Sequence, residues 1–391
     1  MIREAICEGS DVEEALERAK AQLGINDTDD YEFEVIQREE KKRSAGGSLL
    51  GLAAETGFWV SAGALAGAAN YFYEFSMKPV KHDPSHDYEA KELPYTRGRI
   101  WMNGHPLRED WFEISEDGLR IHANYIPSPL PEGDHRYAIC VHGYSDTSES
   151  VGQYAMVYRE RYGMNVLLPD LRGHGKSEGT YVGYGYHDRR DIIVWIDRIL
   201  NKDPKAVFLL HGISMGAATV MMTTGEKLPS NVRACVEDAG YSTAVEEFKH
   251  VYNNLEPRQP VPVDVMMPAL RAVALVRAGY GLGQASPLEA VKRSVTPTLF
   301  IHGDADDFIP CSMMKKLFEA AACKKMSLLV KGAGHVQSVV VDPEGYWAKV
   351  DSFLEKAAPE LAERRGDENF PVDFRKMVEA GETGESETAE A

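Results

Sequence analysis

Cysteine is scarce in this sequence and follows no disulfide or metal-binding pattern. The chain has five cysteines in 391 residues, an odd number without CxxC or zinc-type spacing: Cys7, Cys140, Cys235, Cys311 and Cys323. This pattern argues against a disulfide framework and against a structural zinc site. We therefore expect reduced cysteines that serve in packing, and no bound metal.

Basic residues are also fewer than acidic ones. The 43 Lys and Arg residues face 61 Asp and Glu residues, which gives a formal net charge of −18. Nucleic-acid binding needs clustered Lys and Arg, so no nucleic-acid partner is expected for the main domain. Part of the acidic excess lies in residues 358–391, which end in GETGESETAEA. This composition predicts a solvated, disordered tail.

The first residues of the sequence are charged, and one later run lacks charge. These first residues, MIREAICEGSDVEEALERAK, are charged throughout and do not resemble a secretory signal. Residues 56–73, TGFWVSAGALAGAANYFY, reach the lower length limit of a membrane span and include a GxxxG. Most of this run, however, is Ala, Gly and Ser, which contribute little to insertion. We expect a helical segment over residues 46–80 in a cytoplasmic protein.

Three interpretations of this helical segment stay open. It packs on the protein, it associates with a bilayer surface through residues 56–77, or it spans the membrane. In the last case the basic cluster at residues 41–43 would keep the N-terminus in the cytoplasm, and the remainder would lie outside.

The first 45 residues have the pattern of a small β-α-β unit. Two weakly alternating runs flank a stretch with helical spacing and a capping serine or aspartate, Ser10 or Asp11. The sequence EGSDVEEALERAKAQLGI, followed by an acidic strand and KKRSAGGSLLGL, resembles the N-terminal domain of the Jag family of bacterial RNA-associated proteins. A small docking domain is the simpler interpretation.

From about Trp101 onward, apolar runs alternate with amphipathic helical patterns. WFEIS and LRIHANYI predict an antiparallel hairpin, and the later runs are YAICVHG, MNVLLPD, AVFLLHG, ACVEDAG, PTLFIHGD and MSLLVKG. Runs that are apolar on both faces indicate a mostly parallel sheet covered by helices on both sides, here over residues 81–357. Ligands of such sheets bind at the carboxyl ends of the strands.

One serine stands at a sharp strand-to-helix bend. Gly212-Ile213-Ser214-Met215-Gly216 is a GxSxG that follows the strand-like AVFLL and precedes a helical pattern. This context presents the Ser214 hydroxyl above the sheet, at a helix N-terminus whose dipole favours negative charge. Ser214 is therefore the candidate nucleophile.

A serine nucleophile needs a base, and the base needs an orienting acid. His335 in GAGHVQS follows the last predicted strand and is the candidate base. Acid candidates are Asp304, Asp306 and Asp307 in HGDADDFIP, together with Asp238 in VEDAGYS after the preceding strand. All lie in loops at strand ends, where such side chains can converge.

The tetrahedral intermediate of such a reaction needs hydrogen-bond donors at fixed positions. The backbone N–H of Met215, next to the nucleophile, is one candidate, and that of Tyr144 in HGYSD is the other. We expect His142 and His211 to be structural. Arg172, His174 and Ser177 in LLPDLRGHGKSEG are expected to fix the loop beside the site, because the segment lacks P-loop spacing.

The motifs HGYSD, PDLRGHGKSEG, HGISMG, EDAGYST, HGDADDFIP and GAGHVQS occur in an order that resembles the α/β-hydrolase superfamily. The likeness is to its serine-aminopeptidase and monoglyceride-lipase-like branch, which includes bacterial hydrolases. Its pattern HGxxDxxVP selects Asp306 as the acid over Asp238. The resemblance implies a serine hydrolase without metal or cofactor, and a helical lid at residues 243–284.

These observations predict an enzyme with an α/β-hydrolase fold. It is expected to cleave a carboxylic ester through an acyl-enzyme intermediate. An amide or short peptide substrate is the alternative within the same chemistry. A non-catalytic adaptor with a hydrolase fold is the alternative from another class. The predicted lid has an apolar helix face formed by Val265, Met266, Leu270, Val273, Leu275 and Val276. This face either contacts an acyl chain of the substrate or only seals the core.

Overall fold

The structure of the chain is a computed structural model. It describes residues 18, 20, 21, 49–79, 93–131, 133–255, 259–367 and 369–373. The chain divides into two compact units: Met1–Ser76 with Val251–Ala285, and Met77–His250 with Ser286–Ala391. The β-α-β unit expected over residues 1–45 lies almost entirely outside the described residues, so that expectation stays a prediction.

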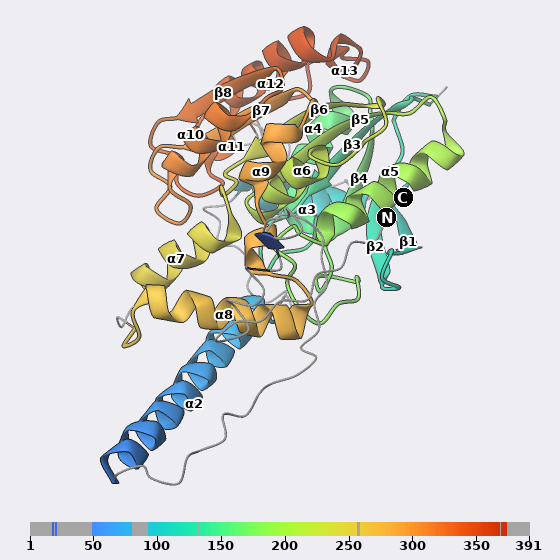
Figure 1. Cartoon of the computed structure of the whole chain (residues 1–391). Helices are drawn as coiled ribbons and strands as arrows, with labels where there is room; N and C mark the ends of the chain where they lie inside the picture. Colours follow the sequence, from blue (N-terminus) through green and yellow to red (C-terminus); the bar gives the residue numbers. More distant parts are fainter. Residues whose placement is uncertain are drawn as a thin grey trace, which may run out of the picture. The chain divides into compact units, whose positions relative to one another are not determined.

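The second unit is built on an eight-stranded sheet in the order β1-β2-β4-β3-β5-β6-β7-β8 (Figure 1). β1 and β2 form the predicted antiparallel hairpin, β2 pairs antiparallel with β4, and all remaining pairs are parallel. The strands are β1 Glu109–Ile114, β2 Arg120–Ile126, β3 Arg136–Val141, β4 Asn165–Asp170, β5 Val207–Ile213, β6 Val232–Asp238, β7 Thr298–Gly303 and β8 Lys325–Val330. The mostly parallel sheet predicted from the apolar runs is confirmed.

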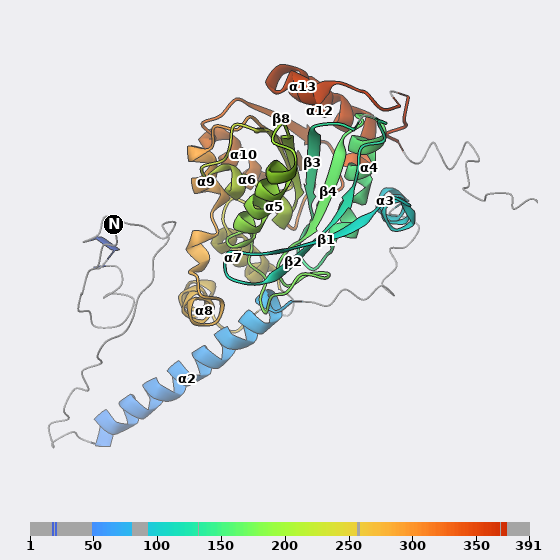
Figure 2. The ribbon, with the colours of Figure 1, turned by 90° about the vertical axis from the view of Figure 1, so that its right-hand side faces the viewer.

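Helices cover both faces of this sheet (Figures 1 and 2). The α-helices of the described residues are α2 Leu49–Met77, α3 Leu93–Gly104, α4 Gly152–Glu160, α5 Asp188–Lys202, α6 Met215–Thr224, α7 Ala244–Asn254, α8 Val263–Ala278, α9 Pro287–Arg293, α10 Cys311–Ala320, α11 Ser338–Val341, α12 Pro343–Ala357 and α13 Pro359–Ala362. Two short 3₁₀ helices, η2 Ser148–Val151 and η3 Leu282–Gln284, complete them.

The alternation of side chains along each strand divides the core in two. On β7, Leu299 and Ile301 join the larger apolar cluster with residues of α4 and α12. Phe300, between them, joins the smaller cluster with residues of α6, α9 and α10. Because successive side chains of a strand point to opposite faces, strands between two helical layers must be apolar throughout.

The first unit contains α2, most of the α7–α8 connection and α8. Arg277 of α8 forms an ion pair with Glu74 of α2 and donates a hydrogen bond to Asn70 at 2.8 Å. Its guanidinium also lies 4.3 Å from the centre of the Tyr73 ring. The predicted lid segment, residues 243–284, is thus divided between the two units, and its action as a lid stays a prediction.

The apolar segment predicted over residues 46–80 is helical as α2. In the described part of the chain, no individual helix combines the length and apolar character needed to cross a bilayer. By length and composition alone, the bent pair Val263–Ala278 and Leu282–Arg293 meets the requirement jointly.

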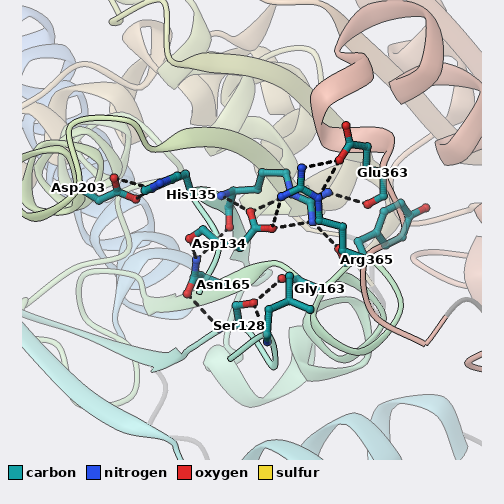
Figure 3. A network of polar contacts seen from close by, with 11 residues as sticks. Ser128, Asp134, His135, Gly163, Asn165, Asp203, Glu363 and Arg365 are labelled. Carbon is teal, nitrogen blue, oxygen red and sulfur yellow. Dashed lines mark hydrogen bonds and ion pairs between the residues drawn. The ribbon is translucent and has the colours of Figure 1, made fainter. Parts of the chain in front are cut away.

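Part of the predicted disordered tail packs against the core. We expected disorder from residue 358, but residues 359–367 and 369–373 are described, with Leu361 fully buried in the core. The buried guanidinium of Arg136, at the start of β3, donates to the carbonyl oxygens of Tyr162 and Glu363 and pairs with Asp134. Figure 3 shows this network, in which Arg365 also reaches Asp134. Acidic composition misled because these contacts use backbone carbonyls, which composition does not reveal.

Candidate active site

Ser214 stands at the bend between β5 and α6. Its backbone has φ 52° and ψ −119°, a left-handed conformation that is unfavourable for a residue with a side chain. Two glycines permit the bend, because a Cβ on Gly212 would lie 2.2 Å from the carbonyl oxygen of Gly216. A Cβ on Gly216 would lie 2.1 Å from the carbonyl oxygen of Val141. The close approach of the chains therefore requires both glycines of the motif.

The structure brings Ser214, His335 and Asp306 into one chain of contacts. The Oγ atom of Ser214 lies 2.9 Å from Nε2 of His335, and Nδ1 of His335 lies 2.8 Å from Oδ2 of Asp306. The other carboxylate oxygen of Asp306 accepts the backbone N–H groups of Phe308 at 3.0 Å and Ile309 at 2.8 Å. This is the geometry of a nucleophile, a base and an orienting acid.

The loops that carry the acid and the base contact each other directly. They follow the neighbouring strands β7 and β8, which pair from Thr298 to Gly303. A Cβ on Gly303 would lie 2.1 Å from the carbonyl oxygen of Ala333, so glycine permits this approach. Asp304 accepts the backbone N–H of Gly332 at 2.6 Å. The carboxylate of Asp304 therefore connects the two loops and takes no part in the contact chain.

Asp238, the alternative acid, lies elsewhere. Its side chain is fully buried on the α12 side of the sheet, beside the hydroxyls of Tyr346 and Ser338, neither of which has the geometry of a regular hydrogen bond to the carboxylate. Burial raises its pKa to about 7. Its backbone carbonyl accepts the N–H of Ser214 at 2.8 Å. Asp238 thus supports the bend through its backbone, while the carboxylate that contacts His335 is that of Asp306.

The two candidate oxyanion donors belong to residues close to Ser214. Met215 is the first residue of α6, where backbone N–H groups have no partner within the helix. Gly143, which precedes Tyr144, lies so close that a Cβ there would be 3.3 Å from Cβ of Ser214. Both Met215 and Tyr144 are therefore adjacent to the serine, one by sequence and one through the loop after β3.

Buried polar groups hold the loops beside the site. Nε2 of His142 accepts the backbone N–H of Leu171 at 3.0 Å, and burial lowers the pKa of His142 to about 3. Arg172 forms an ion pair with Asp191 and the hydroxyl of Ser177 donates to the Asp170 carbonyl. These side chains tie the segment after β4 to the loop that carries Tyr144, by contacts within the protein.

Sequence reasoning missed a group of buried ionisable residues behind Asp306. Nε2 of His302, on β7, donates to the carbonyl of Ile309 at 2.8 Å and lies 3.3 Å from Oδ2 of Asp306. The carboxyls of Glu237 on β6 and Glu247 on α7 are also buried, and burial raises the pKa of each to about 8. The only sequence signal was the histidine of HGDADDFIP, which the motif assigned to no role.

Electrostatics separate Asp306 from the other buried carboxyls. Burial alone would raise its pKa, but hydrogen bonds from His302, His335 and the backbone hold the pKa well below its usual range. Asp306 is therefore ionised at neutral pH, as the orienting acid requires. Among the described residues no cluster of His, Cys, Asp and Glu has the arrangement of a metal site.

Comparison with known proteins relates this geometry to one family. The family model described as "Alpha/beta hydrolase family" matches residues 138–349, more than half of the chain. This range includes Ser214, Asp306 and His335.

Curated relatives match more than half of the chain. The uncharacterized protein YqkD of Bacillus subtilis is 25% identical over 259 residues, which cover 65% of this chain and 84% of YqkD. The monoacylglycerol lipase of Mycolicibacterium smegmatis is 28% identical over 264 residues, covering 58% of this chain and 89% of the lipase.

Solved structures share the fold. An esterase of Pyrococcus furiosus superposes with a TM-score of 0.52 at 17% identity, covering 72% of this chain and 98% of the esterase. At this identity the likeness concerns the fold alone. The likeness of the N-terminus to the Jag domain has no support in these comparisons.

Proposed function

Because the chain belongs to the alpha/beta hydrolase family, we propose that it is a serine hydrolase that cleaves carboxylic esters through an acyl-enzyme intermediate. The observation that carries the proposal is the unbroken contact chain from Ser214 through His335 to Asp306. A binding module has no need of a strained serine with a base and an ionised acid aligned behind it.

The first half of the reaction forms the acyl-enzyme. His335 Nε2 takes the proton of Ser214 as Oγ attacks the ester carbonyl carbon, and the carbonyl oxygen becomes an oxyanion. The backbone N–H groups of Met215 and Tyr144 stabilise that oxyanion. When the carbon–oxygen bond breaks, the imidazolium gives its proton to the leaving alkoxide. Asp306 stabilises the imidazolium through Nδ1.

The second half returns the free enzyme. His335 takes a proton from water, the hydroxide attacks the acyl carbon, and the same two amides hold the second oxyanion. Collapse releases the carboxylic acid, and the proton on His335 returns to Ser214 Oγ. Atoms and charges balance with water as the only co-substrate, so the proposal includes no cofactor.

Aromatic side chains beside the serine support an apolar substrate group. Tyr144 stacks on Tyr184 with ring centres 5.9 Å apart, and Tyr184 contacts Phe248 at 4.7 Å. On the other side, Phe308 lies 5.0 Å from the His335 ring and is 45% exposed. Pockets lined by aromatic groups with few polar ones suit an acyl chain. Small amides are the alternative substrates of the same machinery.

A fluorophosphonate probe tests the proposal, because it phosphonylates only an activated serine. We expect the full-length protein to be labelled, and Ser214→Ala to be unlabelled at equal melting temperature. Ser150→Ala, at a buried serine in η2 outside the contact chain, is the matched control and should label like the wild type.

The substrate class is tested by measuring turnover of p-nitrophenyl esters of increasing chain length and of the matching anilides. We expect ester turnover that rises with acyl length, and much slower anilide turnover. If the folded wild type is neither labelled nor active on any ester, the hydrolase proposal fails and the adaptor alternative takes its place.

A further inference from the structure

A second histidine lies behind the acid of the contact chain. His302 is fully buried, and its Nε2 lies 2.8 Å from the Ile309 carbonyl oxygen. A carbonyl oxygen only accepts, so Nε2 carries a proton. The same nitrogen lies 3.3 Å from Oδ2 of Asp306. One N–H is therefore shared between the Ile309 carbonyl and the oxygen that His335 also contacts.

Each oxygen of Asp306 is thus held by two donors. Oδ1 accepts the N–H groups of Phe308 and Ile309, and Oδ2 faces Nδ1 of His335 at 2.8 Å and Nε2 of His302. The backbone donors fix one edge of the carboxylate. On the second edge, the two donors are the base, His335, and His302.

We propose that His302 is a positioning residue for the reaction: its Nε2–H fixes Oδ2 of Asp306 in the orientation that His335 requires. This inference rests on the proposed function, since the orientation matters only where His335 acts as a base. His302 itself contacts neither Ser214 nor the side of His335 that faces the serine, so it acts through Asp306.

Several carboxyl groups lie around His302. Glu237 faces it from β6, Glu247 from α7 and Asp306 from the loop after β7, while the charge of Asp238 acts from the opposite face of the sheet. Burial alone would lower the pKa of His302, but its hydrogen bonds and these carboxyls outweigh burial and raise it. An imidazole that retains or gains protons is suited to donate toward Asp306.

The other ring nitrogen of His302 offers no second explanation for the position of the ring. Nδ1 is buried and has no hydrogen-bond partner. An unpaired buried nitrogen is unfavourable, because its hydrogen bond to water is lost and not replaced. A purely structural position would be served better by an apolar side chain, so the contacts of Nε2 are the gain that offsets this cost.

The test compares two substitutions at position 302 in the full-length protein. His302→Leu keeps the volume but removes the donor. His302→Gln places an amide near Nε2, and its two N–H groups can serve both the Ile309 carbonyl and Asp306. We expect His302→Leu to lower kcat on a p-nitrophenyl ester about 10²-fold, with KM unchanged, because a misplaced acid costs that much. His302→Gln should recover most of kcat.

The pH profile separates positioning from loss of packing. Without His302, Asp306 interacts more strongly with His335 alone, so the acidic limb of kcat/KM should move to higher pH in His302→Leu and return in His302→Gln. His211→Leu is the matched control. His211 is equally buried on β5, between the hydroxyls of Tyr158 at 2.9 Å and Tyr346 at 3.1 Å, away from Asp306. It should leave both kcat and the limb unchanged.

A low-field proton resonance of the His335–Asp306 hydrogen bond provides a readout that needs no turnover. It should be present in the wild type and in His302→Gln, and lost or shifted in His302→Leu. The inference is overturned if folded His302→Leu matches the wild type in kcat and resonance, or if His302→Gln is as impaired as His302→Leu. Where His302→Leu does not fold, His302→Asn, whose amide is too short to reach, replaces it. Wild-type protein that shows the resonance but no fluorophosphonate labelling contradicts the hydrolase proposal and not this geometry.

Discussion

At the scale of single residues, two buried aspartates at neighbouring strand ends have opposite environments. Asp306 is surrounded by four donors, which hold its pKa far below that of a free aspartate. The carboxylate of Asp238 has no regular hydrogen bond, and burial raises its pKa to about 7. Near neutral pH the first is ionised and the second is partly protonated, so only Asp306 is suited to stabilise an imidazolium.

This difference predicts unequal effects of the same substitution. Asp306→Asn should lower kcat about 10³–10⁴-fold, because an amide cannot stabilise the charged His335 and favours the wrong tautomer. Asp238→Asn should leave kcat within about threefold. Ester turnover of both variants, at equal folded content by circular dichroism, checks the prediction. A large loss in Asp238→Asn with an active Asp306→Asn would reverse the assignment of the acid.

At the scale of elements, helix α2 exposes two large aromatic side chains. Tyr71 and Phe75 are one turn apart on this helix, and they are 74% and 55% exposed. Large exposed aromatic groups on one helix face are typical of sites that contact a partner or a bilayer surface. The uncharged run to which Tyr71 belongs is the one that suggested membrane association.

We therefore expect the full-length protein to float with phosphatidylcholine vesicles in a density gradient. Neutral lipid is the proper choice, because a net charge of −18 opposes binding to anionic headgroups. Replacing both Tyr71 and Phe75 by Ser should weaken binding at least tenfold, since burying such side chains contributes about 1.5–3 kcal/mol each. Val295→Ser, at an apolar residue 87% exposed in the other unit, is the control. Equal flotation of all three proteins would remove α2 as the contact.

At the scale of the whole molecule, two buried glutamates make the stability depend on pH: Glu237 in the sheet and Glu247 on α7. Glu237 and Glu247 titrate near pH 8 in the folded protein, against about 4.3 in an unfolded chain. Between these values the folded state binds protons that the unfolded state does not. Their contribution to the free energy of unfolding therefore falls as the pH rises from about 4.3 to about 8, and it levels off above the folded pKa.

We expect the melting temperature to fall by at least about 3 °C between pH 7 and pH 9. Over this range the carboxyls with lowered pKa, Asp170 and Asp306, are ionised in both states and contribute nothing to the change. Buried thiols act in the same direction as the glutamates, so a variant must isolate the carboxyl. Glu237→Gln should flatten the pH dependence, while Glu355→Gln at an exposed position should not. A melting temperature that stays constant or rises would contradict these pKa shifts.

The sequence predicted the sheet and the strand-end positions of the three contact-chain residues, because apolar runs and glycine bends are local signals. The role of His302 was not predictable, since it depends on a 3.3 Å contact made by the turn after β7. Nothing local marks Glu247 as buried, because its burial comes from packing of α7. The pairing of α2 with α8 likewise joins Asn70 to Arg277, far apart in the chain.

The separation of Ser214 and His335 by 121 positions has a consequence for how the protein is made. His335 follows β8, which is the last strand in the chain and lies at one edge of the sheet. A nascent chain on the ribosome exposes the serine long before the histidine is synthesised. Until translation passes β8, the growing polypeptide contains Ser214 but not His335, so under the proposed mechanism an incomplete chain lacks the base that activates the serine.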